Sequence, residues 1–337
     1  MDQRLLSPQV LIFPFPVQGH VNSMLKLAEL LSLAGLHVTF LNSDYNHRRL
    51  LNYTNIQARF ARYPHFRFET ISDGLPADHP RSSDRMTELF DSIEAVNKPL
   101  FREMLISGRL SSDTRSPVTC VIADGILSFA IDAANEIGVM SIAFRTVSAC
   151  SLWTYFCFPK LVEAGELPFK GNEEMDQMVT SVAGMEGFLR RRDLPSSCRV
   201  NDLSDPTFQL LLTETVKTSR AHALILNTFE ELDAPRGVLA SDIVRTHAMC
   251  CVDWCVLLSS KMLSFWCGFN LERGRLWVGT HPASVIGKLL ACEKYVPHVM
   301  HGLLCAPHSR RLHLVLPSLY QRISRTAVMG VVVAPLY

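Results

Sequence analysis

The chain has 337 residues, of which 48% are hydrophobic and 19% charged, and its formal net charge is +1 at pH 7. This length allows two domains, or one large domain with an appendage. The near-neutral charge gives no reason to expect nucleic acid or an anionic membrane as a partner. No apolar run of about 18 to 20 residues predicts a membrane span. Pro14 and Pro16 interrupt the first apolar run, which therefore does not resemble a secretory leader, and we expect a cytoplasmic protein.

The first half of the chain alternates between predicted strands and helices. A β-branched and aromatic run over 10–13 predicts a strand, and after a turn rich in Pro and Gly the apolar stripe over 20–34 predicts a helix. A second strand is predicted over 37–41, and Ser43 or Asp44 is expected to cap a helix that ends near Leu51. The later predicted elements are strands over 66–70, 118–123, 139–144 and 223–227, and helices over 85–110, 127–137, 147–163 and 206–220.

This alternation predicts a doubly wound α/β domain with a mostly parallel sheet that is covered by helices on both faces. In such sheets, ligands bind beyond the carboxyl ends of the strands. His20 follows the first predicted strand and Asp124 follows the strand over 118–123, so both lie at carboxyl strand ends. A His oriented by an Asp is a general base that can take a proton from a substrate hydroxyl. From spacing alone, the alternative is a helix-terminal His and a turn Asp with no role in catalysis.

The sequence does not contain the motifs of dinucleotide-binding, P-loop or serine-nucleophile sites. The turn after the first strand holds one glycine, Gly19, rather than G-x-G-x-x-G, and no P-loop lysine follows it. A dehydrogenase-type dinucleotide site is therefore not indicated. No G-x-S-x-G motif marks a serine nucleophile.

Composition changes near residue 245, which we take as the boundary between a domain over 1–245 and a tail over 246–337. The tail holds nine Lys and Arg against three acids, whereas the first 245 residues hold 24 against 29. Six of the ten Cys and six of the twelve His also lie in the tail. Their spacing matches no zinc motif, so no metal is expected. One interpretation is a basic appendage that binds anions or metal, and the other is an irregular terminus, out-of-frame or intron-derived, that is not natively folded.

Four ordered motifs make the chain similar to the plant family 1 UDP-glycosyltransferases. They are VLIFPFPVQGHVN at 10–22, VIADG at 121–125, GMEGF at 184–188 with RDLP at 192–195, and LNTFEEL at 226–232. The resemblance covers about residues 8–235, roughly two thirds of the chain. The amino-acid sequence at 22–26 and 36–42 is most similar to that of the iridoid glucosyltransferases of this family.

The resemblance implies the N-terminal, Rossmann-like half of a GT-B fold, which holds the acceptor, and an inverting transfer of glucose from UDP-glucose without a metal or resident cofactor. It implies that His20 deprotonates a hydroxyl or carboxyl of a small plant metabolite of terpenoid or iridoid type. Asp124 would stabilise the resulting imidazolium. The expected acceptor-binding residues lie near the strand ends or the segments that cover them: Phe15, Gly19, Phe129, Phe144, Ser148, Trp153 and Phe188.

Members of the family bind UDP-sugar through a second domain that contains an H-x-G-W-N-S segment. This segment does not occur in these 337 residues. UDP-sugar binding is therefore doubtful, and we expect negligible transfer by this chain alone, because positioning and leaving-group stabilisation supply much of the rate. The alternatives are a truncated isoform that binds acceptor or pairs with a full-length relative, and a gene-model artefact in the tail.

Overall fold

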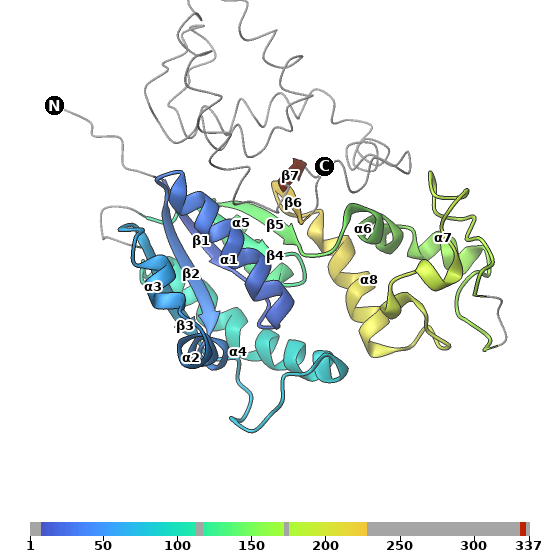
Figure 1. Cartoon of the computed structure of the whole chain (residues 1–337), viewed down its shortest axis with the longest axis horizontal. Helices are drawn as coiled ribbons and strands as arrows, with labels where there is room; N and C mark the ends of the chain where they lie inside the picture. Colours follow the sequence, from blue (N-terminus) through green and yellow to red (C-terminus); the bar gives the residue numbers. More distant parts are fainter. Residues whose placement is uncertain (1–7, 112–116, 172–174, 228–330, 335–337) are drawn as a thin grey trace, which may run out of the picture.

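The computed structural model describes residues 8–111, 117–171, 175–227 and 331–334 (Figure 1). Most of the predicted tail over 246–337 and the motif residues 228–232 lie outside the described residues. The described part is organised around one sheet of seven strands. These are β1 (Gln9–Phe13), β2 (His37–Ser43), β3 (Phe66–Ile71), β4 (Cys120–Asp124), β5 (Met140–Arg145), β6 (Ala223–Asn227) and β7 (Val331–Ala334).

The strand order is β3-β2-β1-β4-β5-β6-β7, and every neighbouring pair is parallel except β6 and β7. The order runs outward in both directions from β1, as in doubly wound folds. The predicted doubly wound, mostly parallel sheet is therefore confirmed. β7 comes from the tail, where no strand was predicted, and it forms an edge of the sheet by pairing with β6 through Val331–Ala334.

Helices cover both faces of the sheet. They are α1 (Gln18–Leu33), α2 (Asp44–Tyr53), α3 (Ile56–Phe60), α4 (Met86–Ile106), α5 (Ser128–Glu136), α6 (Ala149–Phe156), α7 (Phe158–Glu163) and α8 (Pro206–Thr218), with short 3₁₀ turns at Ser83–Arg85, Arg191–Asp193 and Ser196–Cys198. One apolar cluster joins the sheet to α1 and α3, and the other joins its opposite face to α4, α5, α6 and α8. Because both faces are buried, β1 is apolar at nearly every position rather than at alternate ones.

Local sequence sets several helix ends. The Ser43 hydroxyl accepts a hydrogen bond from the Asn46 amide at 3.1 Å and caps α2, as predicted. Asp205 caps α8 in the same way, and Pro206 occupies the first helical position, where its missing N–H is not needed. Gly35 follows α1 with φ at +83°, a conformation that glycine adopts without a steric cost.

The helix predicted over 147–163 is two helices in the structure. α6 ends at Phe156, and α7 begins at Phe158 with Pro159 in its first turn. Inside one continuous helix, Pro159 would remove a hydrogen bond and its ring would meet the carbonyl of residue 155. The chain instead restarts the helix at Cys157, so the single-helix prediction was wrong. The five-residue helix α3 was not predicted, because it is too short to show a periodic pattern.

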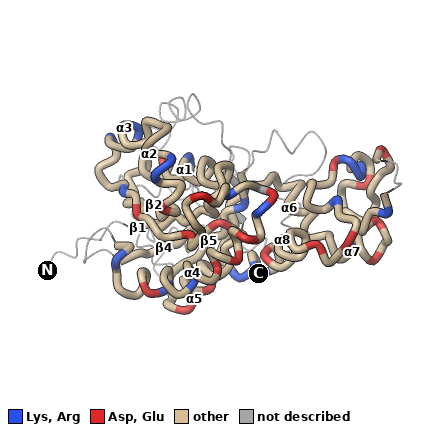
Figure 2. Tube along the Cα trace, turned by 90° about the horizontal axis from the view of Figure 1, so that it is seen from below, with Lys and Arg blue, Asp and Glu red and all other residues tan. Residues whose placement is uncertain are grey.

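Charged side chains of both signs are mixed over the described surface (Figure 2). A few charged groups are buried instead, and they fall in two places: Asp73 and Arg81 in the loop after β3, and Asp124, Arg145 and Glu214 near the carboxyl ends of β4 and β5. Burying a charge is costly unless it is paired or hydrogen-bonded, so both places need a physical explanation. No helix among the described residues is long and apolar enough to cross a membrane.

Candidate active site

The topology brings His20 and Asp124 together. β1 and β4 are neighbouring parallel strands in which Phe13 pairs with Ala123, so the chain leaves both strands at the same edge of the sheet. His20 lies in the first turn of α1, just after β1, and Asp124 is the last residue of β4. The His20 Nδ1 atom lies 2.6 Å from Asp124 Oδ2, although 104 residues separate them in the sequence.

The Asp124 carboxylate is held on several sides. Its side chain is 1% exposed, and besides His20 it accepts hydrogen bonds from the amides of Phe15 at 3.2 Å and Ile126 at 3.3 Å. These three donors come from the turn after β1, from α1 and from the turn after β4. A buried carboxylate with such donors remains an acceptor. We therefore infer that Nδ1 of His20 carries the proton of this hydrogen bond.

The remaining ring nitrogen of His20 is Nε2. A neutral imidazole that donates from Nδ1 has its lone pair on Nε2. The ring is 23% exposed, and Thr146 Oγ1 lies 3.5 Å from each nitrogen, at the limit of a hydrogen bond. Phe15 packs edge-to-face against the ring with the centroids 5.7 Å apart, which restrains its orientation. The His20 ring is thus held by Asp124 on one side and by Phe15 on another.

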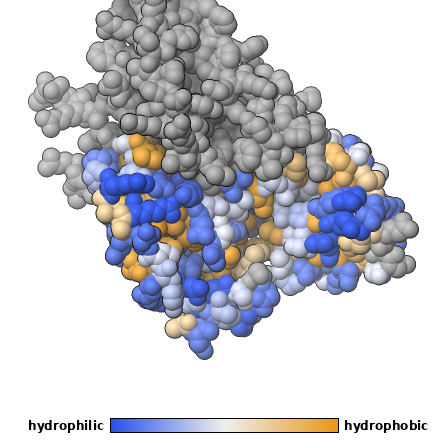
Figure 3. Space-filling view, in the orientation of Figure 1, coloured by the Kyte–Doolittle hydropathy of each residue, from blue (hydrophilic) through white to orange (hydrophobic). Residues whose placement is uncertain are grey.

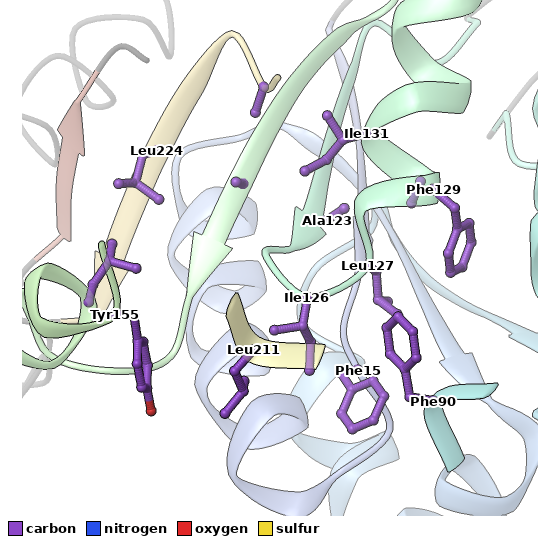
Figure 4. Packing of buried hydrophobic residues seen from close by; sticks show 14 of the residues in the cluster. Phe15, Phe90, Ala123, Ile126, Leu127, Phe129, Ile131, Tyr155, Leu211 and Leu224 are labelled. Atoms are coloured by element: carbon purple, nitrogen blue, oxygen red, sulfur yellow. The ribbon is translucent and has the colours of Figure 1, made fainter. Parts of the chain in front are cut away.

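Phe15, which packs against His20, is one of several buried apolar side chains beyond the strand ends. In Figure 4, Tyr155, Leu211, Ile126 and Phe15 lie in a row beyond the carboxyl ends of β4 and β5. In Figure 3, a hollow separates the sheet from the lobe around α7, and apolar residues border it. An apolar surface with a few polar groups is typical of a small-molecule site.

Comparison with known proteins places this arrangement in a family. The family model for the glycosyltransferase N-terminal domain matches residues 7–185. The 7-deoxyloganetic acid glucosyltransferase of Catharanthus roseus is 46% identical, in an alignment that covers 84% of this chain and 69% of that enzyme. The chain belongs to the plant UDP-glycosyltransferases. Other relatives of this chain include mogroside I-A1 synthase of Siraitia grosvenorii (42% identical, covering 68% of this chain and 43% of the relative) and (R)-mandelonitrile beta-glucosyltransferase of Prunus dulcis (39%, covering 67% and 47%).

Solved glycosyltransferase structures share the fold. The chain matches a UDP-glucose:anthocyanidin 3-O-glucosyltransferase in complex with UDP with a TM-score of 0.55 at 24% identity, covering 71% of this chain and 50% of that one. It matches Os79 from O. sativa, in complex with U2F and trichothecene, with a TM-score of 0.51 at 22% identity, covering 68% and 49%. The chain thus spans about half the length of these structures. Because residues 1–245 are about 73% of the 337 residues, the 84% coverage shows that the C. roseus alignment continues past residue 245.

Two of the seven predicted acceptor-binding residues lie at the pair itself. Phe15 is fully buried against His20. Gly19 lies in the first turn of α1, where its carbonyl accepts a hydrogen bond from the Ser23 hydroxyl at 2.8 Å, and an added Cβ would meet no atom within 4 Å. The backbone at Gly19 is therefore open beside His20.

The other predicted acceptor-binding residues have structural contacts of their own. Phe129 packs edge-to-face on Phe13 and Phe101, and Trp153 donates its indole N–H to the Ala183 carbonyl at 2.9 Å. Phe144 belongs to the apolar cluster on the α1 face, Ser148 caps α6, and Phe188 is partly buried beside the opposite cluster. Acceptor contact by these residues stays a prediction.

Sequence reasoning missed Arg145 and Thr146, which end and follow β5. Thr146 lies against His20, and its carbonyl accepts a hydrogen bond from the Asn227 side chain at 3.3 Å. Ligands bind beyond the carboxyl ends of parallel strands, and this rule, which located Asp124 at the end of β4, applies equally to the end of β5. The sequence therefore contained enough information to predict these two residues. The side chains that face the edge depend on the exact end of the strand, which was predicted one residue early.

Proposed function

We propose that this domain binds a small plant metabolite of terpenoid or iridoid type and prepares its hydroxyl or carboxyl oxygen to accept glucose from UDP-glucose. The observation that carries the proposal is the 2.6 Å contact between His20 and Asp124 at the carboxyl edge of the sheet. The names of the relatives support a metabolite acceptor, since they include glucosyltransferases of 7-deoxyloganetic acid and of (R)-mandelonitrile.

In this mechanism Nε2 of His20 removes the acceptor proton as the oxygen attacks the anomeric carbon, and UDP departs from the opposite face with inversion. Asp124 holds the ring in the tautomer that leaves Nε2 free, and its charge stabilises the imidazolium that forms. The protein's residues supply orientation and proton transfer. The donor half of a family member would supply the contacts to the diphosphate.

We further propose that the 337-residue chain, on its own, binds acceptor but transfers no sugar. The sequence has no H-x-G-W-N-S segment to hold the diphosphate, and an oriented base does not replace leaving-group stabilisation. A chain of this kind would act as an acceptor-binding module, or would pair with a full-length relative and reduce its activity.

Calorimetric titration tests this pair of proposals. We expect saturable heat when the purified 337-residue chain is titrated with 7-deoxyloganetic acid, and none with millimolar UDP-glucose. The C. roseus enzyme serves as a control that should bind both. Saturable binding of UDP-glucose would show that the chain holds a donor site and would overturn the non-catalytic proposal. Failure to bind any metabolite acceptor would count against the acceptor-binding function itself.

A further inference from the structure

Arg145 is a buried cation at the same edge of the sheet as the proposed base. It is the last residue of β5 and precedes Thr146, which lies 3.5 Å from the His20 ring. Because side chains alternate along a strand, Arg145 points to the opposite face from Phe144, and it reaches the Gly125 carbonyl that Thr218 of α8 also contacts. Arg145 is 3% exposed, and its guanidinium lies 5.9 Å from the centre of the Tyr155 ring.

The guanidinium of Arg145 uses little of its hydrogen-bonding capacity. A guanidinium carries five N–H donors. Within the described part of the chain, Arg145 donates one hydrogen bond, from Nη1 to the Gly125 carbonyl at 3.2 Å, and it forms no ion pair. Its stem packs on Gly125 so closely that a Cβ there would lie 2.3 Å from Arg145 Cδ, so the stem is held in place. A guanidinium that makes one hydrogen bond to the described residues can take a further hydrogen-bonding partner.

A second buried arginine shows what a purely structural one looks like in this protein. Arg81 donates two hydrogen bonds to the Asp73 carboxylate, at 2.9 and 3.1 Å, and its guanidinium lies 4.0 Å from the centre of the Tyr45 ring. It also donates to three carbonyls of its own loop, those of Leu75, Pro76 and His79. Arg81 thus donates five hydrogen bonds within its own loop, whereas Arg145 donates one to the described residues.

The carboxylates nearest to Arg145 already have partners. Asp124 is bonded to His20, and Glu214 accepts hydrogen bonds from the Lys217 ammonium at 2.9 Å and the Ser128 amide at 3.1 Å. Burial lowers the pKa of Arg145, and the charges of Asp124 and Glu214 oppose this effect only from a distance. A further anion in contact with the guanidinium would stabilise its charged form.

We propose that Arg145 binds a carboxylate of the acceptor, a proposal that rests on the acceptor-binding function given above. The planar guanidinium matches a carboxylate in two parallel hydrogen bonds. An acceptor that extends across the ends of β4 and β5 would place its reacting hydroxyl at His20 and its carboxylate at Arg145. The carboxylate is then a recognition group, separate from the oxygen that receives the sugar. This assigns the acceptor to the hydroxy acids rather than to their esters.

The test compares binding of 7-deoxyloganetic acid with binding of its methyl ester by calorimetry. We expect the wild-type 337-residue chain to bind the acid about 10- to 100-fold more tightly, the effect of a charge-assisted hydrogen bond. Arg145→Met should bring the two affinities together while leaving the ester affinity unchanged. Thr218→Val is the matched control, since Thr218 donates to the same Gly125 carbonyl at 3.0 Å but carries no charge. It should keep the preference for the acid.

Equal wild-type affinity for acid and ester would overturn the carboxylate assignment and leave the acceptor-binding proposal standing. An Arg145→Met variant that weakens both ligands equally would also overturn it, because Arg145 would then only support the fold. If Arg145→Met does not fold, Arg145→Lys replaces it as the test variant. Lysine keeps the positive charge but cannot form the two parallel hydrogen bonds to a carboxylate. We expect a smaller preference for the acid with the ester affinity retained, and an unchanged preference would refute the proposal. If neither ligand binds the wild-type chain, both proposals fail together.

Discussion

Replacement of His20 by alanine is expected to lower kcat/KM about 100- to 10,000-fold in a chimera that joins residues 1–232 to the donor half of the C. roseus glucosyltransferase. The chimera supplies the diphosphate contacts of a family donor half, so the contribution of the proposed base becomes measurable. His20 has the geometry for the role, with Nδ1 bonded to Asp124 and Nε2 available to an acceptor. Transfer would be measured as product formed from UDP-glucose and 7-deoxyloganetic acid.

Two variants make the chimera experiment specific. Asp124→Asn should also lower kcat/KM, because an amide no longer fixes the tautomer or stabilises the imidazolium. His37→Ala is the control, since His37 begins β2 at the opposite end of the sheet and stacks on His65. It should leave kcat/KM unchanged. A His20→Ala chimera as active as its parent would remove His20 from the mechanism.

Substitution of Phe101 by alanine is expected to lower the free energy of unfolding by about 3–5 kcal/mol. Phe101 comes from α4 and is fully buried. It stacks on Phe13 with the ring centroids 5.1 Å apart and meets Phe129 edge-to-face at 6.3 Å. Removal of the ring leaves a cavity between α4, α5 and β1, directly beneath the turn that carries the proposed base.

Urea unfolding of the 337-residue chain measures this loss. Leu100→Ala is the matched control, because the neighbouring Leu100 is 39% exposed, and its unfolding free energy should stay within about 0.5 kcal/mol of the wild type. Equal effects of the two substitutions would mean that Phe101 is not part of a packed core. A changed dependence on urea concentration for Phe101→Ala alone would indicate that the unfolding is not two-state.

Much of the fold could be predicted from the sequence because its signals are local. β1 and β4 are short apolar runs with turns after them, and their observed ends fall within two residues of the predicted ones. Pro159 also indicates the break between α6 and α7. Because the apolar pattern continues on both sides of Pro159, a single helix was predicted instead. The pairing of β7 with β6 joins residues more than 100 positions apart, and no local pattern predicts such a contact.

The candidate site was predictable to the extent that topology alone determines it. Adjacent parallel strands bring their carboxyl ends together, and this was sufficient for His20 and Asp124. The face of the sheet to which each side chain points is harder to predict from the sequence. Phe144 and Arg145 are neighbours in the sequence, yet one packs beneath α1 and the other points toward α8. Sequence reasoning named Phe144 and missed Arg145, because the choice depends on strand register.

The proposed mechanism requires Asp124 to hold His20 with the proton on Nδ1 and Nε2 free to act as a base. Long-range ¹H–¹⁵N spectra of the chain labelled at histidine, with His20→Gln for assignment, test it most directly at a pH where the imidazole is neutral. The account predicts the Nδ1–H tautomer for His20, and a loss of this preference in Asp124→Asn. Observation of the Nε2–H tautomer in the wild-type chain would contradict the proposed base and the mechanism built on it.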